Sequence, residues 1–190
     1  LSIESDGLEL RISKTIEAPQ ELVWNAWTDA GLLAQWWGPF GYTNEVVEFN
    51  AVDGAEYRIV QTGNDGVSHP FKGTFKRVSA PEHFILTQIY DVPPYDEDEL
   101  TVALTLKGAR NQTVLTSTTF FPSVEAKDDA LDAGMIQGMS ESLERLDILL
   151  RFQQGVQQKQ VTFVRHFDAA IEDVWESWTN AEQLAQWWGP

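Results

Sequence analysis

The chain has 190 residues, a formal net charge of −16, 43% hydrophobic residues and no cysteine. The lack of cysteine excludes disulfides, thiolate metal sites and a cysteine nucleophile, and it fits a cytoplasmic protein. A surface this acidic repels phosphate backbones, so we expect no nucleic-acid partner, and no run of 18 apolar residues predicts a membrane span.

Residues 8–16 alternate apolar and polar side chains and predict a first, half-buried strand. Two short helices joined by a tight corner follow. Pro19 suits the first helical position, and Thr28 or Asp29 can cap the second helix. Gly38-Pro39 then ends that helix.

The tryptophan-rich segment occurs twice, 151 residues apart. Aligned from Ile12 and Phe163, 14 of 28 positions are identical, and all eight tryptophans lie in the two copies. This repeat predicts a domain at 1–153, a linker at 154–160 and the beginning of a second, truncated copy at 161–190. Thirty residues cannot build a core. We therefore expect the tail to pack on the first domain, on a second chain as a homodimer or domain swap, or on the missing part of a longer tandem protein.

After Gly41 the pattern is typical of strands for about eighty residues. Six strands are expected near 46–49, 55–62, 71–76, 84–90, 100–106 and 113–121. The period then changes to 3.6, and we expect residues 125–153 to form one continuous helix across the whole sheet. Small residues in its middle either leave room beneath the helix or allow it to pack closely on the strands.

Few residues suggest catalysis or metal binding. The four carboxylates at 96–99 are interpreted as a solvated loop, and the three histidines, His69, His83 and His166, lack metal-ligand spacing. No nucleotide or hydrolase motif is present, so we expect no metal, no cofactor and no assigned catalytic residue. Tyr57 is the best single candidate for a general acid, because its hydroxyl can donate a proton.

The order of strand, two helices, six strands and long helix, with A-P-x-E-L-V-W-x-A-W-T-D at 18–29 and Q-W-W-G-P at 35–39, resembles the activator of heat-shock-protein-90 ATPase homologue family. The resemblance implies an α+β, START-like helix-grip fold. In that fold a curved antiparallel sheet of about seven strands wraps on a long C-terminal helix and often encloses a cavity for a small apolar ligand.

The cavity candidates are side chains at the end of the second short helix, on inward strand faces and on the long helix: Trp37, Tyr57, Ile59, Phe71, Phe75, Leu86, Gln88, Leu104, Ser117, Met135 and Met139. Gln88 and Ser117 either orient a ligand or bond to neighbouring backbone or water. These residues favour a non-catalytic domain that binds a small hydrophobic ligand or a protein client in a co-chaperone-like manner. The alternative is an enzyme of polyketide cyclase or aromatase type. An open cavity lined by Tyr57, Gln88 and Ser117 would favour ligand binding or catalysis. A filled interior with an exposed apolar patch on the outer face of the sheet would favour docking of a protein.

Overall fold

The computed structural model describes residues 1–155 and 169–187. The chain divides into two compact units, Leu1–Gln157 and Gln158–Pro190. In the larger unit the strands are β1 (Ser2–Asp6), β2 (Glu9–Ile16), β3 (Thr43–Glu48), β4 (Glu56–Thr62), β5 (Ser68–Ser79), β6 (His83–Tyr90), β7 (Leu100–Ala109) and β8 (Gln112–Phe120). Its helices are α1 (Gln20–Thr28), α2 (Ala30–Trp36), α3 (Val124–Asp132) and α4 (Met135–Gln153).

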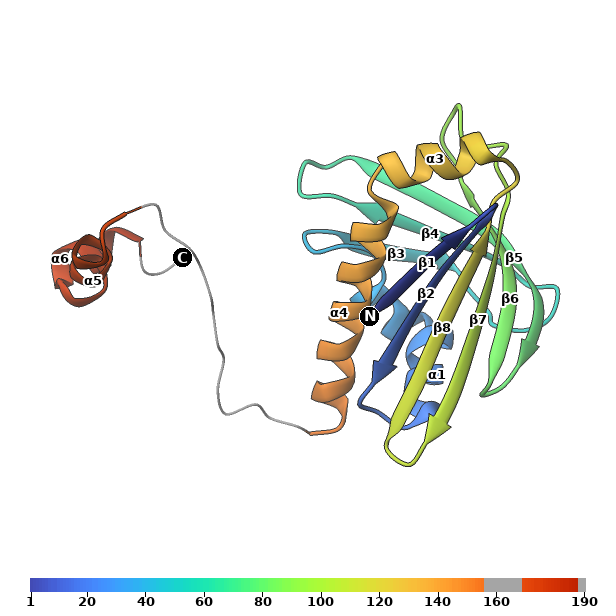
Figure 1. Cartoon of the computed structure of the whole chain (residues 1–190), viewed down its shortest axis with the longest axis horizontal. Helices are drawn as coiled ribbons and strands as arrows, with labels where there is room; N and C mark the ends of the chain where they lie inside the picture. Colours follow the sequence, from blue (N-terminus) through green and yellow to red (C-terminus); the bar gives the residue numbers. More distant parts are fainter. Residues whose placement is uncertain (156–168, 188–190) are drawn as a thin grey trace. The chain divides into compact units, whose positions relative to one another are not determined.

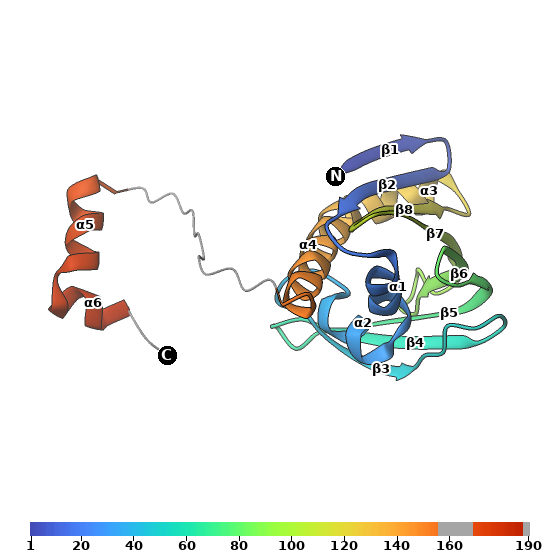
Figure 2. The ribbon, with the colours of Figure 1, turned by 90° about the horizontal axis from the view of Figure 1, so that it is seen from below.

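One antiparallel sheet has the order β1-β2-β8-β7-β6-β5-β4-β3. It curls around α1 and α2, and α4 lies along the open side of the curl (Figures 1 and 2). The α+β helix-grip architecture is confirmed, with eight strands in place of about seven. No helix in the described part of the chain is long and apolar enough to cross a membrane.

The strand that the sequence did not predict is β1. Its five residues are all exposed, so they show no alternation between apolar and polar positions. Backbone pairing with β2 across the turn at Gly7, where φ is +50°, holds the strand at the edge of the sheet. Side chains therefore contribute little to the position of β1.

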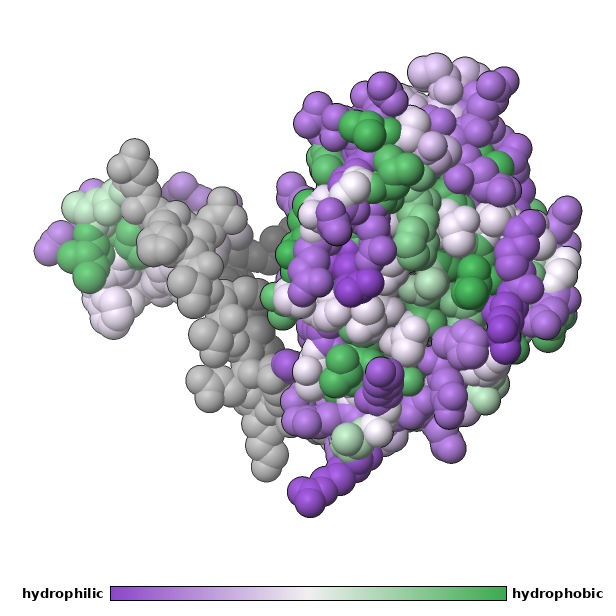
Figure 3. All heavy atoms as spheres, turned by 45° about the vertical axis from the view of Figure 1, so that its right-hand side comes forward, coloured by the Kyte–Doolittle hydropathy of each residue, from purple (hydrophilic) through white to green (hydrophobic). Residues whose placement is uncertain are grey.

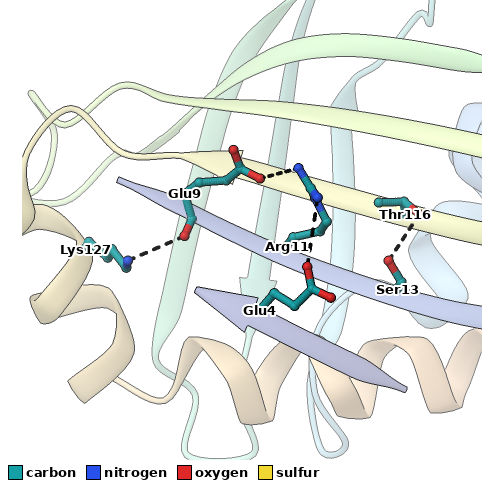
Figure 4. A network of polar contacts seen from close by, with 6 residues as sticks. All are labelled: Glu4, Glu9, Arg11, Ser13, Thr116 and Lys127. Carbon is teal, nitrogen blue, oxygen red and sulfur yellow. Dashed lines mark hydrogen bonds and ion pairs between the residues drawn. The ribbon is translucent and has the colours of Figure 1, made fainter. Parts of the chain in front are cut away.

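The amine of Lys127 ties α3 to this edge (Figure 4). Lys127 is buried and donates to the carbonyl oxygens of Gly7 at 2.6 Å and Glu9 at 3.5 Å. Two backbone acceptors compensate part of the cost of burying the ammonium group. The Ser13 and Thr116 hydroxyl oxygens, 3.2 Å apart, connect β2 to β8.

The prediction of a single helix over 125–153 is wrong. The segment forms α3 and α4, which are separated at Ala133 and Gly134. Gly134 has φ +86° and ψ 24°, a left-handed conformation that glycine adopts without steric cost. The chain therefore turns where the sequence shows an apparently continuous helical pattern.

The predicted helix pair at the beginning of the chain is present as α1 and α2. Asp29 caps α2, since its carboxylate accepts from the Leu32 amide at 2.8 Å. The Trp36 ring packs edge-on against Trp27, with centroids 4.6 Å apart, and its Nε1 donates to Ala26 O at 2.8 Å. The pair forms the centre of the core inside the curled sheet.

The smaller unit repeats this pair in α5 (Ile171–Thr179) and α6 (Ala181–Trp187). Trp178 and Trp187 have ring centroids 4.5 Å apart, and Trp187 Nε1 donates to Ser177 O at 3.0 Å. Asn180 caps α6 at the position that corresponds to Asp29. Residues 161–168 of the expected second copy and residues 156–160 of the expected linker lie outside the described residues.

Candidate functional site

The concave face of the sheet is covered over one half and accessible over the other. Alternate side chains point to the same face of a strand. On β6, Phe84 and Leu86 are buried, whereas Gln88 and Tyr90, in the same phase, are only half-buried. On β5, Phe75 is fully buried while Phe71 is half-buried. Solvent therefore reaches the concave face near the Tyr90 end of β6.

Aromatic rings form a row on the accessible half. Trp37 and Phe71 meet edge-on with centroids 5.0 Å apart, and Phe71 lies 5.2 Å from Tyr90. Beyond Tyr90 the row continues to His69 at 6.0 Å and to Tyr95 at 6.2 Å. We call Trp37, Phe71, Tyr90 and His69 the aromatic row.

The sequence-predicted cavity residues fall into two groups. Six lie buried in the covered core and are not accessible: Tyr57, Ile59, Phe75, Leu86, Leu104 and Ser117. Five are half-buried: Trp37, Phe71, Gln88, Met135 and Met139. Trp37 and Phe71 belong to the aromatic row. Met139 of α4 packs against the core. The sequence did not identify His69 and Tyr90 as members of the site.

The hydroxyl of Tyr57 bonds to the protein backbone and takes no part in the candidate site. Its ring lies beside Gly73 on the neighbouring strand, and its hydroxyl donates to Thr87 O on β6 at 3.0 Å. A Cβ at Gly73 would lie 2.7 Å from the Tyr57 ring and 1.8 Å from Thr87 O. Glycine at position 73 thus allows Tyr57 to cross β5, and the hydroxyl is not available to a ligand.

Tyr57 should make the larger unit sensitive to alkali. Burial raises the pKa of its phenol well above the ordinary value of about 10. Below about pH 10 the phenol is protonated in both states, and the unfolding free energy is unaffected by its titration. Above about pH 10 the phenol loses its proton only in the unfolded state, which lowers the unfolding free energy by about 1.4 kcal/mol per pH unit. We expect Tyr57→Phe to flatten the fall of unfolding free energy between about pH 10 and 11.5, measured by urea denaturation. Tyr95→Phe, an exposed control, should leave the fall unchanged.

Three polar side chains on the concave face have unused hydrogen-bonding atoms. The amides of Gln61 and Gln88 and the Nε2 of His69 make no hydrogen bond to any described residue. Gln61 is the cross-strand partner of His69, so the two side chains are neighbours on one face. A few polar groups in an apolar setting are typical of small-molecule sites.

Positive charge is used elsewhere. Arg58 and Lys72 both bind the carboxylate of Asp91, at 2.8 and 2.6 Å. The hydrogen bonds from Lys72 and Arg58 lower the pKa of Asp91. Both basic residues lie in the phase opposite to Tyr57 and Phe71, which places them on the outer face of the sheet.

Residues of α4 fix the corner that carries Trp37. The guanidinium of Arg145 donates to the carbonyl oxygens of Pro39 at 2.8 Å, Gly38 at 2.9 Å and Gln35 at 3.0 Å. Glu141 accepts from the Phe40 amide at 3.0 Å. The hydrogen bonds from Gln137 and from this amide lower the pKa of Glu141. The first ring of the aromatic row is therefore held on rigid backbone.

Asn44 holds the same corner from β3. Its amide nitrogen donates to Trp37 O at 2.6 Å and to Ala34 O at 3.0 Å. Its amide oxygen is buried and has no partner among the described residues. No group of three potential metal ligands gathers within 1–155 and 169–187, and the acidic run at 96–99 is mostly exposed.

Comparison with known proteins places this geometry in a family. The family described as Activator of Hsp90 ATPase homolog 1-like protein matches residues 17–151. A structure from Arthrobacter aurescens is 23% identical, covers 86% of this chain and 99% of its own, and has a TM-score of 0.76. A protein from Mycobacterium smegmatis is 24% identical with coverages of 87% and 99% and a TM-score of 0.73.

A third structure, the AHSA1 protein from Silicibacter pomeroyi, is 18% identical, covers 76% of this chain and 99% of its own, and has a TM-score of 0.64. At these identities the solved structures show the fold alone. No match is found among curated proteins.

Proposed function

This chain belongs to the family of Activator of Hsp90 ATPase homolog 1-like proteins, and we propose that its larger unit binds a small hydrophobic ligand on the accessible half of the concave face, without catalysing a reaction. The observation that carries the proposal is the half-buried aromatic row on a face whose other residues form the core. Large aromatic side chains left partly in water gain free energy when a ligand covers them.

Two features support a binding role for this face over a purely structural one. Arg145 and Asn44 hold Trp37 in place before any ligand arrives, which reduces the ordering cost of binding. On α4, a side chain added at Gly138 would meet nothing within 4 Å, so there is open space beside the helix at that point. Flexible Met135 and Met139 lie on either side of it and can adapt to a ligand.

The test is binding of the neutral dye N-phenyl-1-naphthylamine, whose fluorescence rises in apolar surroundings. We expect Phe71→Ala to weaken dye binding about ten-fold, because a buried phenylalanine side chain contributes about 1.5–3 kcal/mol and part of this contact is lost. The matched control is Phe120→Ala, the same change at an exposed residue of β8. Equal affinities for the two variants, with both folded, would contradict the proposal.

The enzyme alternative, of polyketide cyclase or aromatase type, depends on a proton-transfer group at this site. His69 and Tyr90 are such groups, since His69 Nδ1 and the Tyr90 hydroxyl lie 2.8 Å apart. Turnover of a bound apolar carbonyl compound that is lost in His69→Gln, with binding retained, would favour the enzyme.

The co-chaperone-like alternative uses the opposite face of the sheet. Val114 and Phe120 of β8 are 45% and 43% exposed. Figure 3, which brings the β5 and β6 side forward, shows hydrophobic side chains surrounded by polar ones on the surface. Loss of binding to a protein client in Phe120→Ala, with dye binding intact, would favour docking on this face.

We also propose that residues 161–190 begin a second copy of the same domain. The matching tryptophan contacts and caps of α5 and α6 support this tandem repeat. Trp175 is 70% exposed, whereas its counterpart Trp24 is 8% exposed, so no strand among the described residues covers the second pair as the sheet covers the first. A second copy of the chain is one partner for this surface.

Simple exchange of the two helix pairs in a domain swap is disfavoured by two positions. Gln20 bonds to Pro81 O, Leu106 O and Gly108 N, and isoleucine at the corresponding position 171 can form none of these bonds. Leu22, which packs against the core, corresponds to Asp173. A homodimer through 161–190 would therefore use the exposed surface without displacing α1 and α2.

A further inference from the structure

The aromatic row changes from apolar to polar along its length. It begins at Trp37, which packs edge-on against Phe71, and continues to Tyr90. At the far end the imidazole of His69 stacks on Tyr90 with an interplanar angle of 22°. A ligand lying along the row therefore meets ring faces and edges over most of its length and hydrogen-bonding atoms at one end.

The polar end has a defined hydrogen-bonding pattern. His69 Nδ1 lies 2.8 Å from the Tyr90 hydroxyl, and Nε2 has no partner among the described residues. If Nδ1 donates to Tyr90, Nε2 is an acceptor; if Nδ1 accepts, Nε2 is a donor. A hydroxyl both donates and accepts, so it complements Nε2 in either tautomer.

The charges around the site disfavour a ligand whose polar group is an anion. A carboxylate or phosphate would need a free cation, but Arg58 and Lys72 are paired with Asp91 and Arg145 is occupied by backbone carbonyls. The net charge of −16 also repels anions. The amide of Gln61, directly across from His69, adds a second neutral group that can both donate and accept.

We propose that the site is specific for a planar aromatic molecule that carries a hydroxyl group, with its ring along Trp37, Phe71 and Tyr90 and its hydroxyl bonded to His69 Nε2. This inference rests on the proposed ligand-binding function and adds the ligand's chemical class. His69 is thereby the residue that determines specificity, and Tyr90 holds its imidazole in place.

The experiment compares 2-naphthol, naphthalene and 2-naphthoate as competitors of N-phenyl-1-naphthylamine on the full chain. We expect 2-naphthol to bind about three- to ten-fold more tightly than naphthalene, the range of one neutral hydrogen bond, and 2-naphthoate to bind most weakly. His69→Phe should abolish the preference for 2-naphthol while leaving naphthalene affinity within about two-fold. Tyr90→Phe should reduce the preference in part.

The matched control is His83→Phe, the same substitution at a histidine of β6 whose side chain lies on the outer face of the sheet. This variant should keep the full preference for 2-naphthol over naphthalene. If the dye and naphthalene bind but 2-naphthol has no advantage, or if its advantage survives His69→Phe, the hydroxyl specificity is wrong and the proposed function stands. If neither the dye nor any naphthalene compound binds, both proposals are wrong. Tightest binding of 2-naphthoate would also overturn the inference, because it would require a free cation at the site.

Discussion

Replacing Trp36 by alanine is expected to lower the free energy of unfolding of the larger unit by about 3–5 kcal/mol. Trp36 is 1% exposed, its ring contacts Trp27, and its indole nitrogen donates to Ala26 O. The variant leaves a cavity between α1 and α2 and an unpaired buried carbonyl, and both effects destabilise the folded state. Urea unfolding followed by far-UV circular dichroism measures the loss without relying on tryptophan fluorescence.

The repeat supplies an internal control for this experiment. Trp187→Ala removes the equivalent ring, which packs on Trp178 in the same geometry but is 44% exposed and belongs to the smaller unit. We expect the main unfolding transition to shift by less than about 0.5 kcal/mol, the usual effect of changes away from a core. Similar losses in the two variants would show that α5 and α6 stabilise the larger unit, against the division into two units.

The helix pair could be predicted from sequence because its determinants are local. These determinants lie within one short segment: tryptophans three and nine residues apart, the capping Asp29, and Gly38-Pro39. Each of them has the predicted role in the structure. The identity between the two copies added a second, independent observation of the same pattern. The sheet also followed from alternation, except for β1, whose five exposed residues show no buried face.

The break at Gly134 shows where periodicity fails. Apolar residues keep a period of 3.6 through 125–153, but one glycine with positive φ interrupts the helix without disturbing that count. Glycine is both a small residue that helices tolerate and a common helix terminator, and the 3.6 period alone does not separate the two roles. The family match over 17–151 and the eight-stranded sheet support the fold assignment although the helical segment is broken.

The candidate site could be predicted only in part, because its contacts join distant segments. Tyr90 lies on the same face of β6 as Phe84, Leu86 and Gln88. It is the last residue of the strand, where the sequence pattern does not show whether the side chain still belongs to the site. The pairing of Phe71 with Tyr90 and of Gln61 with His69 depends on the register of β4, β5 and β6. Tyr57 is buried, and its hydroxyl reaches Thr87 O because Gly73 has no side chain in the way.

Arg145→Met is expected to lower the unfolding free energy by about 2–3 kcal/mol, because hydrogen bonds to a charged donor contribute about 1.5–3 kcal/mol. The guanidinium reaches the carbonyls of Gln35, Gly38 and Pro39 from α4, more than 100 residues away in sequence. Burial lowers the pKa of Arg145, but arginine remains protonated in proteins, so the bonds stay charge-assisted. Methionine keeps the apolar stem and removes the donors.

Two further variants separate this clamp from general helix effects. Arg145→Lys should recover less than half of the loss, since one ammonium cannot reproduce a planar fork across three carbonyls. Arg151→Met, at an exposed position in the last turn of α4, should change stability by less than about 0.5 kcal/mol. Because the corner held by Arg145 positions Trp37, Arg145→Met should also weaken dye binding at temperatures where the protein remains folded. Full dye affinity in a destabilised Arg145→Met variant would show that Trp37 is positioned by Asn44 and the core alone.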